Sequence, residues 1–161
     1  MLPDLIITSW LDAPKYLRAK NDRISCAISI TDPGVRAPSG FRAVEKKLRL
    51  QFIDVRDEGG MGSPPELLHV KQIVQFTEHI ARANGKTLIH CHAGISRSTA
   101  AGFIVLAKIL GPGNELEALD HILALRSIAY PNQPMIRMAD ALLERDGAMH
   151  AALVERNVSR L

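Results

Sequence analysis

The segment from Thr87 to Leu110 constrains the fold more than any other part of this chain. Its first residues are apolar and strand-like, a polar loop with the sequence HCHAGISRS follows, and a long apolar run completes it. This order predicts a buried strand, a tight loop and the first turn of a buried helix. Such a loop turns successive backbone N–H groups inward, beside the positive end of a helix dipole. It therefore binds a tetrahedral oxyanion such as phosphate.

Two chemically active side chains lie six positions apart in this loop. Cys91 should lose its proton easily there, because the positive field stabilises the charged thiolate. Arg97 can reach back across the loop and bind two phosphate oxygens with its planar fork. A lone cysteine in an apolar strand is usually a core residue and a lone arginine is usually on the surface. A polar loop between two buried segments has no such structural use, so the pattern predicts a sulfur nucleophile beneath a bound phosphate.

The sequence HCHAGISRS resembles the signature loop of the cysteine-dependent protein tyrosine phosphatases, His-Cys-x5-Arg-Ser/Thr. It is most similar to the HCxAGxSRS form of the dual-specificity branch, and the resemblance extends more weakly over residues 24–145. It implies a single-domain enzyme of the bacterial type, with Cys91 as the nucleophile and Ser98 as the hydroxyl that supports the leaving thiolate. The other residues of the loop form the implied phosphate-binding cradle: His92, Ala93, Gly94, Ile95, Ser96 and Arg97.

A general acid must protonate the leaving oxygen, and the resemblance places an aspartate on a movable loop before the cysteine. Asp54 directly follows a strand-like run, 37 residues before Cys91, and resembles a strand-end Phe-x-Asp of related phosphatases. Asp57 lies 34 residues before Cys91 and matches the usual dual-specificity spacing better. We favour Asp54, with an insertion after it, and keep Asp57 as the alternative.

Hydrophobic periodicity predicts the elements around this loop. Strand-like runs cover 5–7, 24–30, 48–52 and 86–90, and helical patterns cover 15–18, 63–84, 97–110, 114–127 and 135–145. Ser63 with Glu66, and Asn114 with Glu117, have the spacing of capping boxes. Strands mixed with long helices predict an α/β fold, with a central sheet of about four to five mostly parallel strands flanked by helices on both sides.

Composition limits the domain count and the partners. The chain has 161 residues, 47% of them hydrophobic, and a net charge of only +3. This length suits one phosphatase domain, residues 1–161, with 148–161 as a short last helix or a loosely attached tail. The weak positive charge suits an anionic substrate and does not favour nucleic acid. No signal peptide or membrane-spanning run is evident. We expect a cytoplasmic monomer that acts on a phosphorylated protein or a small phosphate ester.

Histidines and the second cysteine have simpler interpretations. Cys26 lies in an alternating strand and is expected in the core. His90 resembles the motif histidine that orients the loop, and His92 occupies an outward position. The two histidines are a poor metal pair because the cysteine separates them and no third ligand is near in sequence. We expect neither a metal nor an organic cofactor.

Two other polar clusters are expected to be structural. One resembles a phosphatase region that packs against the active-site side: Arg126, Asn132 and Gln133. The other is a small basic patch that suggests a solvated face: Lys46, Lys47 and Arg49.

Other functions also use a Cys-x5-Arg loop. A phosphatase-like fold can bind phosphorylated partners without turnover, and sulfur-transfer or arsenate-reducing domains share the loop. A reductase needs a resolving cysteine, and only Cys26 is available for that role. The loop also lacks the lysines that resemble inositol-lipid specificity. We predict a protein tyrosine or dual-specificity phosphatase that works through phosphocysteine. The alternatives are a catalytically weak phosphoprotein-binding module and a phosphatase for a non-protein ester.

Overall fold

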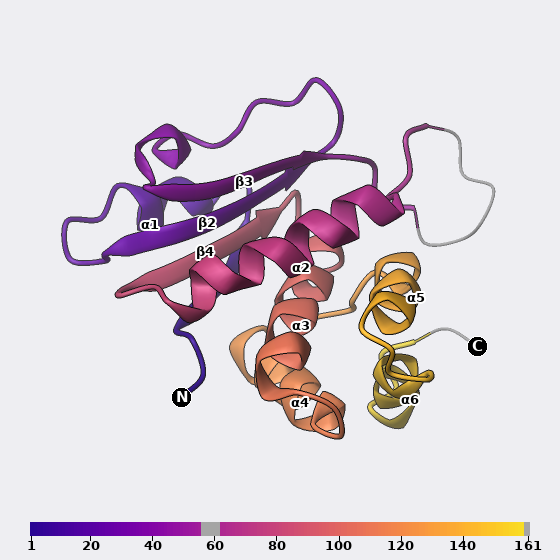
Figure 1. The fold of residues 1–161 in the computed structure, drawn as a ribbon. Coiled ribbons are helices and arrows are strands. Elements are labelled where there is room, and N and C mark those ends of the chain that lie inside the picture. Colours follow the sequence, from indigo (N-terminus) through magenta and orange to yellow (C-terminus); the bar gives the residue numbers. More distant parts are fainter. Residues whose placement is uncertain (56–61, 160–161) are drawn as a thin grey trace.

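The computed structural model describes residues 1–55 and 62–159, and within them a parallel sheet lies between helices (Figure 1). Its strand order is β1-β4-β2-β3, with every neighbouring pair parallel. The strands are β1 (Leu5–Ser9), β2 (Ile24–Thr31), β3 (Lys46–Gln51) and β4 (Lys86–Cys91). The predicted α/β fold is confirmed.

Helices cover both faces of this sheet. The helices are α1 (Ala13–Leu17), α2 (Leu67–Ala81), α3 (Arg97–Leu110), α4 (Glu115–Leu125), α5 (Gln133–Leu142) and α6 (Ala148–Glu155), with a 3-10 turn η1 (Phe41–Ala43). Figure 1 shows α2 in front of the sheet and α1 behind it. Helix α3 is central, since residues 97–107 are all buried. Helix α6 contributes Met149 and Leu153 to the same core. No helix in the described ranges is long and apolar enough to span a bilayer.

Parallel strands bring the candidate site together at one edge of the sheet. Ser9 of β1 pairs with Cys91 of β4, and Thr31 of β2 pairs with Gln51 of β3. The loops that follow all four strands therefore begin side by side, at the carboxyl edge where α/β proteins bind ligands.

The predicted start of α2 and the predicted capping box of α4 are wrong. Helix α2 begins at Leu67, because consecutive prolines at 64–65 hold the preceding chain extended. Glu66 is its N-cap, and the capping box forms with His69, whose Nδ1 accepts the Glu66 backbone N–H at 2.9 Å. Asn114 does hold the N-cap position of α4, but its side chain donates backwards to the carbonyl of Leu110, so no capping box forms.

Candidate active site

The HCHAGISRS loop joins β4 to α3 as predicted. Cys91 is the last residue of β4 and is 2% exposed. Ser98 lies in the first turn of α3, and its Oγ is 3.1 Å from the Cys91 Sγ. A hydroxyl at this distance can donate a hydrogen bond to a thiolate.

The backbone carbonyls of the loop all point outward. Those of residues 91–96 accept hydrogen bonds from the surrounding protein at 2.8–3.1 Å. The donors are the ring of His90, the backbone N–H of Trp10, the guanidinium of Arg126 (two carbonyls) and the backbone N–H groups of Tyr130 and Asn132. Because the C=O and N–H of a trans peptide point in opposite directions, the loop N–H groups face its interior. Within the described residues, the N–H groups of 92–96 donate to no other protein group.

Gly94 allows this loop to lie directly against β1. Its φ is +70°, in the left-handed region that favours glycine. A Cβ added there would lie 2.7 Å from the carbonyl carbon of Thr8, closer than any side chain can approach. A side chain at position 94 would therefore push the loop away from the sheet.

Arg97 is buried, and one edge of its guanidinium is held by the protein. NH1 donates to Asp32 Oδ1 at 2.6 Å and to the Phe52 carbonyl at 2.7 Å. The Nε is also buried, and it has no hydrogen-bond partner in the described structure. A buried, unpaired N–H is costly unless a ligand satisfies it. The Nε edge is therefore available for two oxygens of a bound oxyanion.

Asp54 lies against the loop, just beyond the end of β3. Its Oδ1 accepts hydrogen bonds from Ser96 Oγ at 2.6 Å and from Asn132 Nδ2 at 3.0 Å. The structure thus brings Asp54 together with the loop that contains Cys91. The alternative acid, Asp57, lies outside the described residues.

Three residues position the site in ways that the sequence alone did not indicate. The sequence alone did not single out Asp32, although it is the first residue after β2 at the edge where the loops meet. Arg126 and Asn132 were expected mainly to pack against the active-site side, and they do lie there. In addition, Arg126 supports two loop carbonyls, and Asn132 joins the loop, Asp54 and the start of α5. The signal available for Asn132 was its place before Gln133-Pro134, the pattern of a capped helix start.

His90 is held as a neutral ring. Burial is the main cause that lowers its pKa to about 4. Its Nδ1 donates to the Cys91 carbonyl, and its Nε2, 2.7 Å from Ser29 Oγ, accepts the serine hydroxyl. This tautomer follows from the network, because the Cys91 carbonyl can only accept. The ring therefore fixes the peptide next to the candidate nucleophile.

Cys26 is too far from Cys91 to form a disulfide. It pairs with Thr87 on β4, four residues before Cys91 in the same strand. At about 3.3 Å per residue the separation is about 13 Å, beyond disulfide reach. Burial raises the pKa of the Cys26 thiol, as expected for a core cysteine. A reductase mechanism with Cys26 as the resolving residue does not fit this sheet. Among the described residues, no cluster of three His, Cys, Asp or Glu could hold a metal ion.

Comparisons with known proteins give the family. No family model matches the chain. Dual specificity protein phosphatase 15 of Mus musculus is 30% identical over 132 residues, 82% of this chain and 52% of that protein. Its Homo sapiens counterpart is 31% identical over 133 residues, 82% of this chain and 41% of that protein. The chain thus spans about half the length of the curated relatives it matches.

Solved structures agree with these relatives. The crystal structure of DUSP15 has a TM-score of 0.67 and 25% identity, over 96% of this chain and 93% of that one. Human DUSP28 has a TM-score of 0.69 at 21% identity, over 91% and 96%, and shows the shared fold. This chain belongs to the cysteine-dependent protein tyrosine phosphatase superfamily, in its dual-specificity branch. The relatives named are mammalian and give no support to a bacterial type.

Proposed function

We propose that this chain hydrolyses phosphate monoesters on protein tyrosine, and on serine and threonine, through a phosphocysteine intermediate. One observation carries the proposal: the carbonyls of residues 91–96 all point outward, so the loop N–H groups surround the space in front of the Cys91 thiol. The buried, unpaired Nε of Arg97 adds a cation at the same loop. This arrangement fits a phosphoryl group and places a nucleophile beneath it.

The first step transfers the phosphoryl group to sulfur. The Cys91 thiolate attacks phosphorus, a P–S bond forms, and the bond from phosphorus to the substrate oxygen breaks. The loop N–H groups and Arg97 stabilise the charge on the three non-bridging oxygens. Asp54 donates a proton to the leaving oxygen, so that the product departs as a neutral alcohol or phenol.

The second step releases phosphate. Water attacks phosphorus, Asp54 accepts a proton from that water, and the P–S bond breaks with its electron pair on sulfur. Ser98 Oγ, 3.1 Å from Sγ, donates a hydrogen bond to the departing thiolate. Neither step calls for a metal or an organic cofactor. Asp57 remains the alternative acid.

The proposed substrate is a phosphorylated protein, as the name of the curated relatives indicates for those proteins. A small non-protein phosphate ester is the second candidate. Cys26 and Cys91 are both unpaired, which favours a reducing compartment such as the cytoplasm, where we place a monomeric enzyme.

Turnover of p-nitrophenyl phosphate in the presence of EDTA tests the chemistry, and phosphotyrosine and phosphothreonine peptides test the substrate. Release of inorganic phosphate from both peptides supports dual specificity. Tight peptide binding without phosphate release would instead identify a phosphoprotein-binding module. Turnover of the aryl phosphate but of neither peptide would indicate a non-protein ester.

A further inference from the structure

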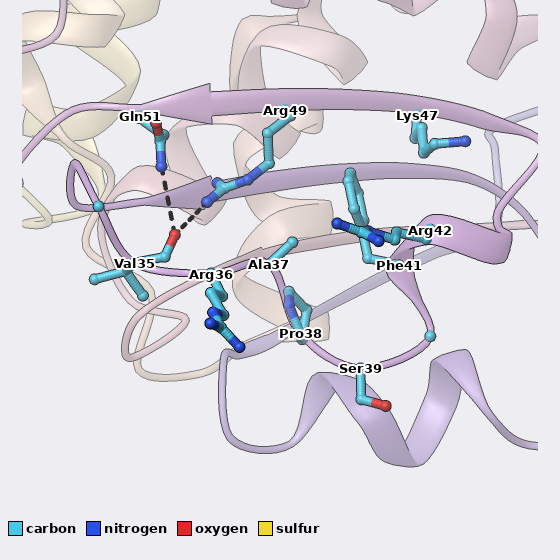
Figure 2. Close-up of a pocket in the computed structure, with 12 residues that line it drawn as sticks. Val35, Arg36, Ala37, Pro38, Ser39, Phe41, Arg42, Lys47, Arg49 and Gln51 are labelled. Carbon is cyan, nitrogen blue, oxygen red and sulfur yellow. Dashed lines mark hydrogen bonds between the residues drawn. The ribbon is translucent and has the colours of Figure 1, made fainter.

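A groove of about 920 Å³ lies beside β3, outside the candidate active site (Figure 2). Its walls are the segment Gly34–Arg42 and the side chains of β3 that point toward that segment. Strand β3 is an edge strand, so within the described residues no further strand pairs with its outer edge. Val35 fixes one end of the groove, because its carbonyl accepts hydrogen bonds from Arg49 at 2.6 Å and Gln51 at 3.4 Å.

The groove is lined by cations and has no acidic lining residue in the described structure. The cations are Arg36, Arg42, Lys47 and Arg49. The whole chain carries a net charge of only +3, so positive charge is concentrated here. The floor includes apolar groups, among them the buried ring of Phe41.

These cations divide into two kinds. The guanidinium of Arg49 is partly buried and occupied by Val35 and Thr31, and Lys47 donates to the Val44 carbonyl. Arg36 and Arg42 are exposed, and within the described part of the chain neither side chain forms a hydrogen bond or an ion pair. Figure 2 shows Arg42 extending over the groove. The interpretation of residues 46–49 as a plain solvated face is therefore incomplete, since two of them line a shaped site.

Hydrogen bonds connect the groove to the HCHAGISRS loop, which we call the catalytic loop. The Trp10 Nε1 donates to the Arg36 carbonyl at 2.8 Å, and the Trp10 backbone N–H donates to the His92 carbonyl at 3.0 Å. The same segment begins just after Asp32, which holds Arg97. From Gln51 to Lys47 the groove runs about 13 Å along β3, the length of about four extended residues.

We infer that this groove binds an acidic, extended segment of the protein substrate, next to the phosphorylated residue in the catalytic loop. The inference rests on the proposed function for its protein substrate. Carboxylate side chains pair with Arg36 and Arg42, and apolar stems pack on the floor beside Phe41. A peptide is the expected ligand because the groove is long enough for about four extended residues, lies beside the phosphate-binding loop and is positively charged.

Two peptides with the same phosphotyrosine test this, one flanked by four glutamates and one by four glutamines. For the wild-type protein we expect kcat/KM to be about tenfold higher for the acidic peptide, mainly through KM, with the advantage falling at 0.5 M NaCl. In Arg36→Gln/Arg42→Gln the acidic-to-neutral ratio should fall to about one. The matched control, Lys71→Gln/Arg82→Gln, removes two exposed charges from the α2 region and should keep the wild-type ratio.

A second measurement separates docking from catalysis. Fluorescence anisotropy of an unphosphorylated four-glutamate peptide needs no turnover, and binding should be lost in the Arg36/Arg42 variant and kept in the control. Binding of this peptide by a protein that shows no phosphatase turnover would contradict the proposed function but support the groove as a peptide site. Equal ratios in wild type and variant, or no binding of the acidic peptide, would overturn the inference. Preferential binding to phosphatidylserine vesicles would also overturn it, in favour of a membrane surface.

Discussion

The catalytic loop and the segment that carries Asp54 lie against each other but are held in different ways. Donors from the residue after β1, from the end of α4 and from the segment before α5 support the carbonyls of the loop. The carboxylate of Asp54 accepts side-chain hydrogen bonds, among them those from Ser96 Oγ and Asn132 Nδ2 to Oδ1. The loop is therefore held through its backbone carbonyls along its length, whereas these hydrogen bonds to the acid run between side chains.

This difference matches the two chemical tasks. An oxyanion site must keep its donors in place before the substrate arrives, because reorganisation during the reaction costs rate. A general acid must reach a leaving group whose position changes from substrate to substrate, and side-chain hydrogen bonds can rearrange for this without a change in the loop. Removing a group inside the loop should therefore cost more than removing a group from the acid's segment.

The largest effect is expected for Cys91→Ser. A serine hydroxyl is a much weaker nucleophile at neutral pH than a thiolate, so kcat should fall by roughly four orders of magnitude or more. Binding of tungstate should persist, because the loop N–H groups and Arg97 remain. Cys26→Ser is the matched control, since it makes the same change at a buried cysteine on β2 and should keep turnover. Residual activity of Cys91→Ser above about one per cent would refute covalent catalysis.

Arg97→Lys should come next. An ammonium cannot reproduce the two-point contact of the guanidinium. We expect kcat/KM to fall at least about 100-fold, the cost of losing one oxyanion contact. Arg126→Lys tests the outer side of the same loop, where the side chain supports carbonyls and does not face phosphate. It should cost only about tenfold, measured by steady-state kinetics on p-nitrophenyl phosphate. Equal losses in the two variants would show that Arg97 is only structural.

The third effect separates the two aspartates. Asp54→Asn should lower kcat about 100-fold for a phosphotyrosine peptide, and less for an activated aryl phosphate, whose leaving oxygen needs less protonation. It should also abolish the basic limb of the pH–rate profile, because the acid acts in its protonated form. Asp57→Asn is the control and should cost little. The opposite pattern would move the role to Asp57, and an unchanged profile in both would exclude this mechanism.

The same two regions show how far the sequence leads. The loop could be predicted because its strand, glycine, cysteine, arginine and helix are contiguous, so local spacing specifies the geometry. The contacts of Asp32 and Asn132 could not, because they join residues 65 and 78 positions apart along the chain. The choice between Asp54 and Asp57 depends on an insertion whose length no periodicity reveals. The predicted capping boxes of α2 and α4 were wrong for local reasons. Two prolines delay the start of α2, and the side chain of Asn114 bonds backwards instead of capping α4.

The smallest expected effect is on stability. It tests whether His90 stays neutral in the folded protein, where its ring holds the Cys91 carbonyl. Burial lowers the pKa of His90 to about 4, below the ordinary 6.5. Between pH 7 and pH 5 the unfolded chain takes up a proton at this residue and the folded chain does not. The free energy of unfolding should therefore decrease as the pH is lowered from 7 to 5, and His90 should account for about 2 kcal/mol of this decrease.

Urea unfolding of wild type and His90→Gln at pH 7 and pH 5 measures this contribution. The variant has no ring to protonate, so the wild type should lose about 2 kcal/mol more than the variant over this range. Ser29→Ala is the control: it removes the hydroxyl from Nε2 but leaves the ring buried, so its pH dependence should follow that of the wild type. An equal loss in wild type and His90→Gln would mean that His90 is accessible to protons in the folded state. The Cys91 carbonyl would then lack its fixed donor, and the loop would be less rigid than its hydrogen bonds indicate.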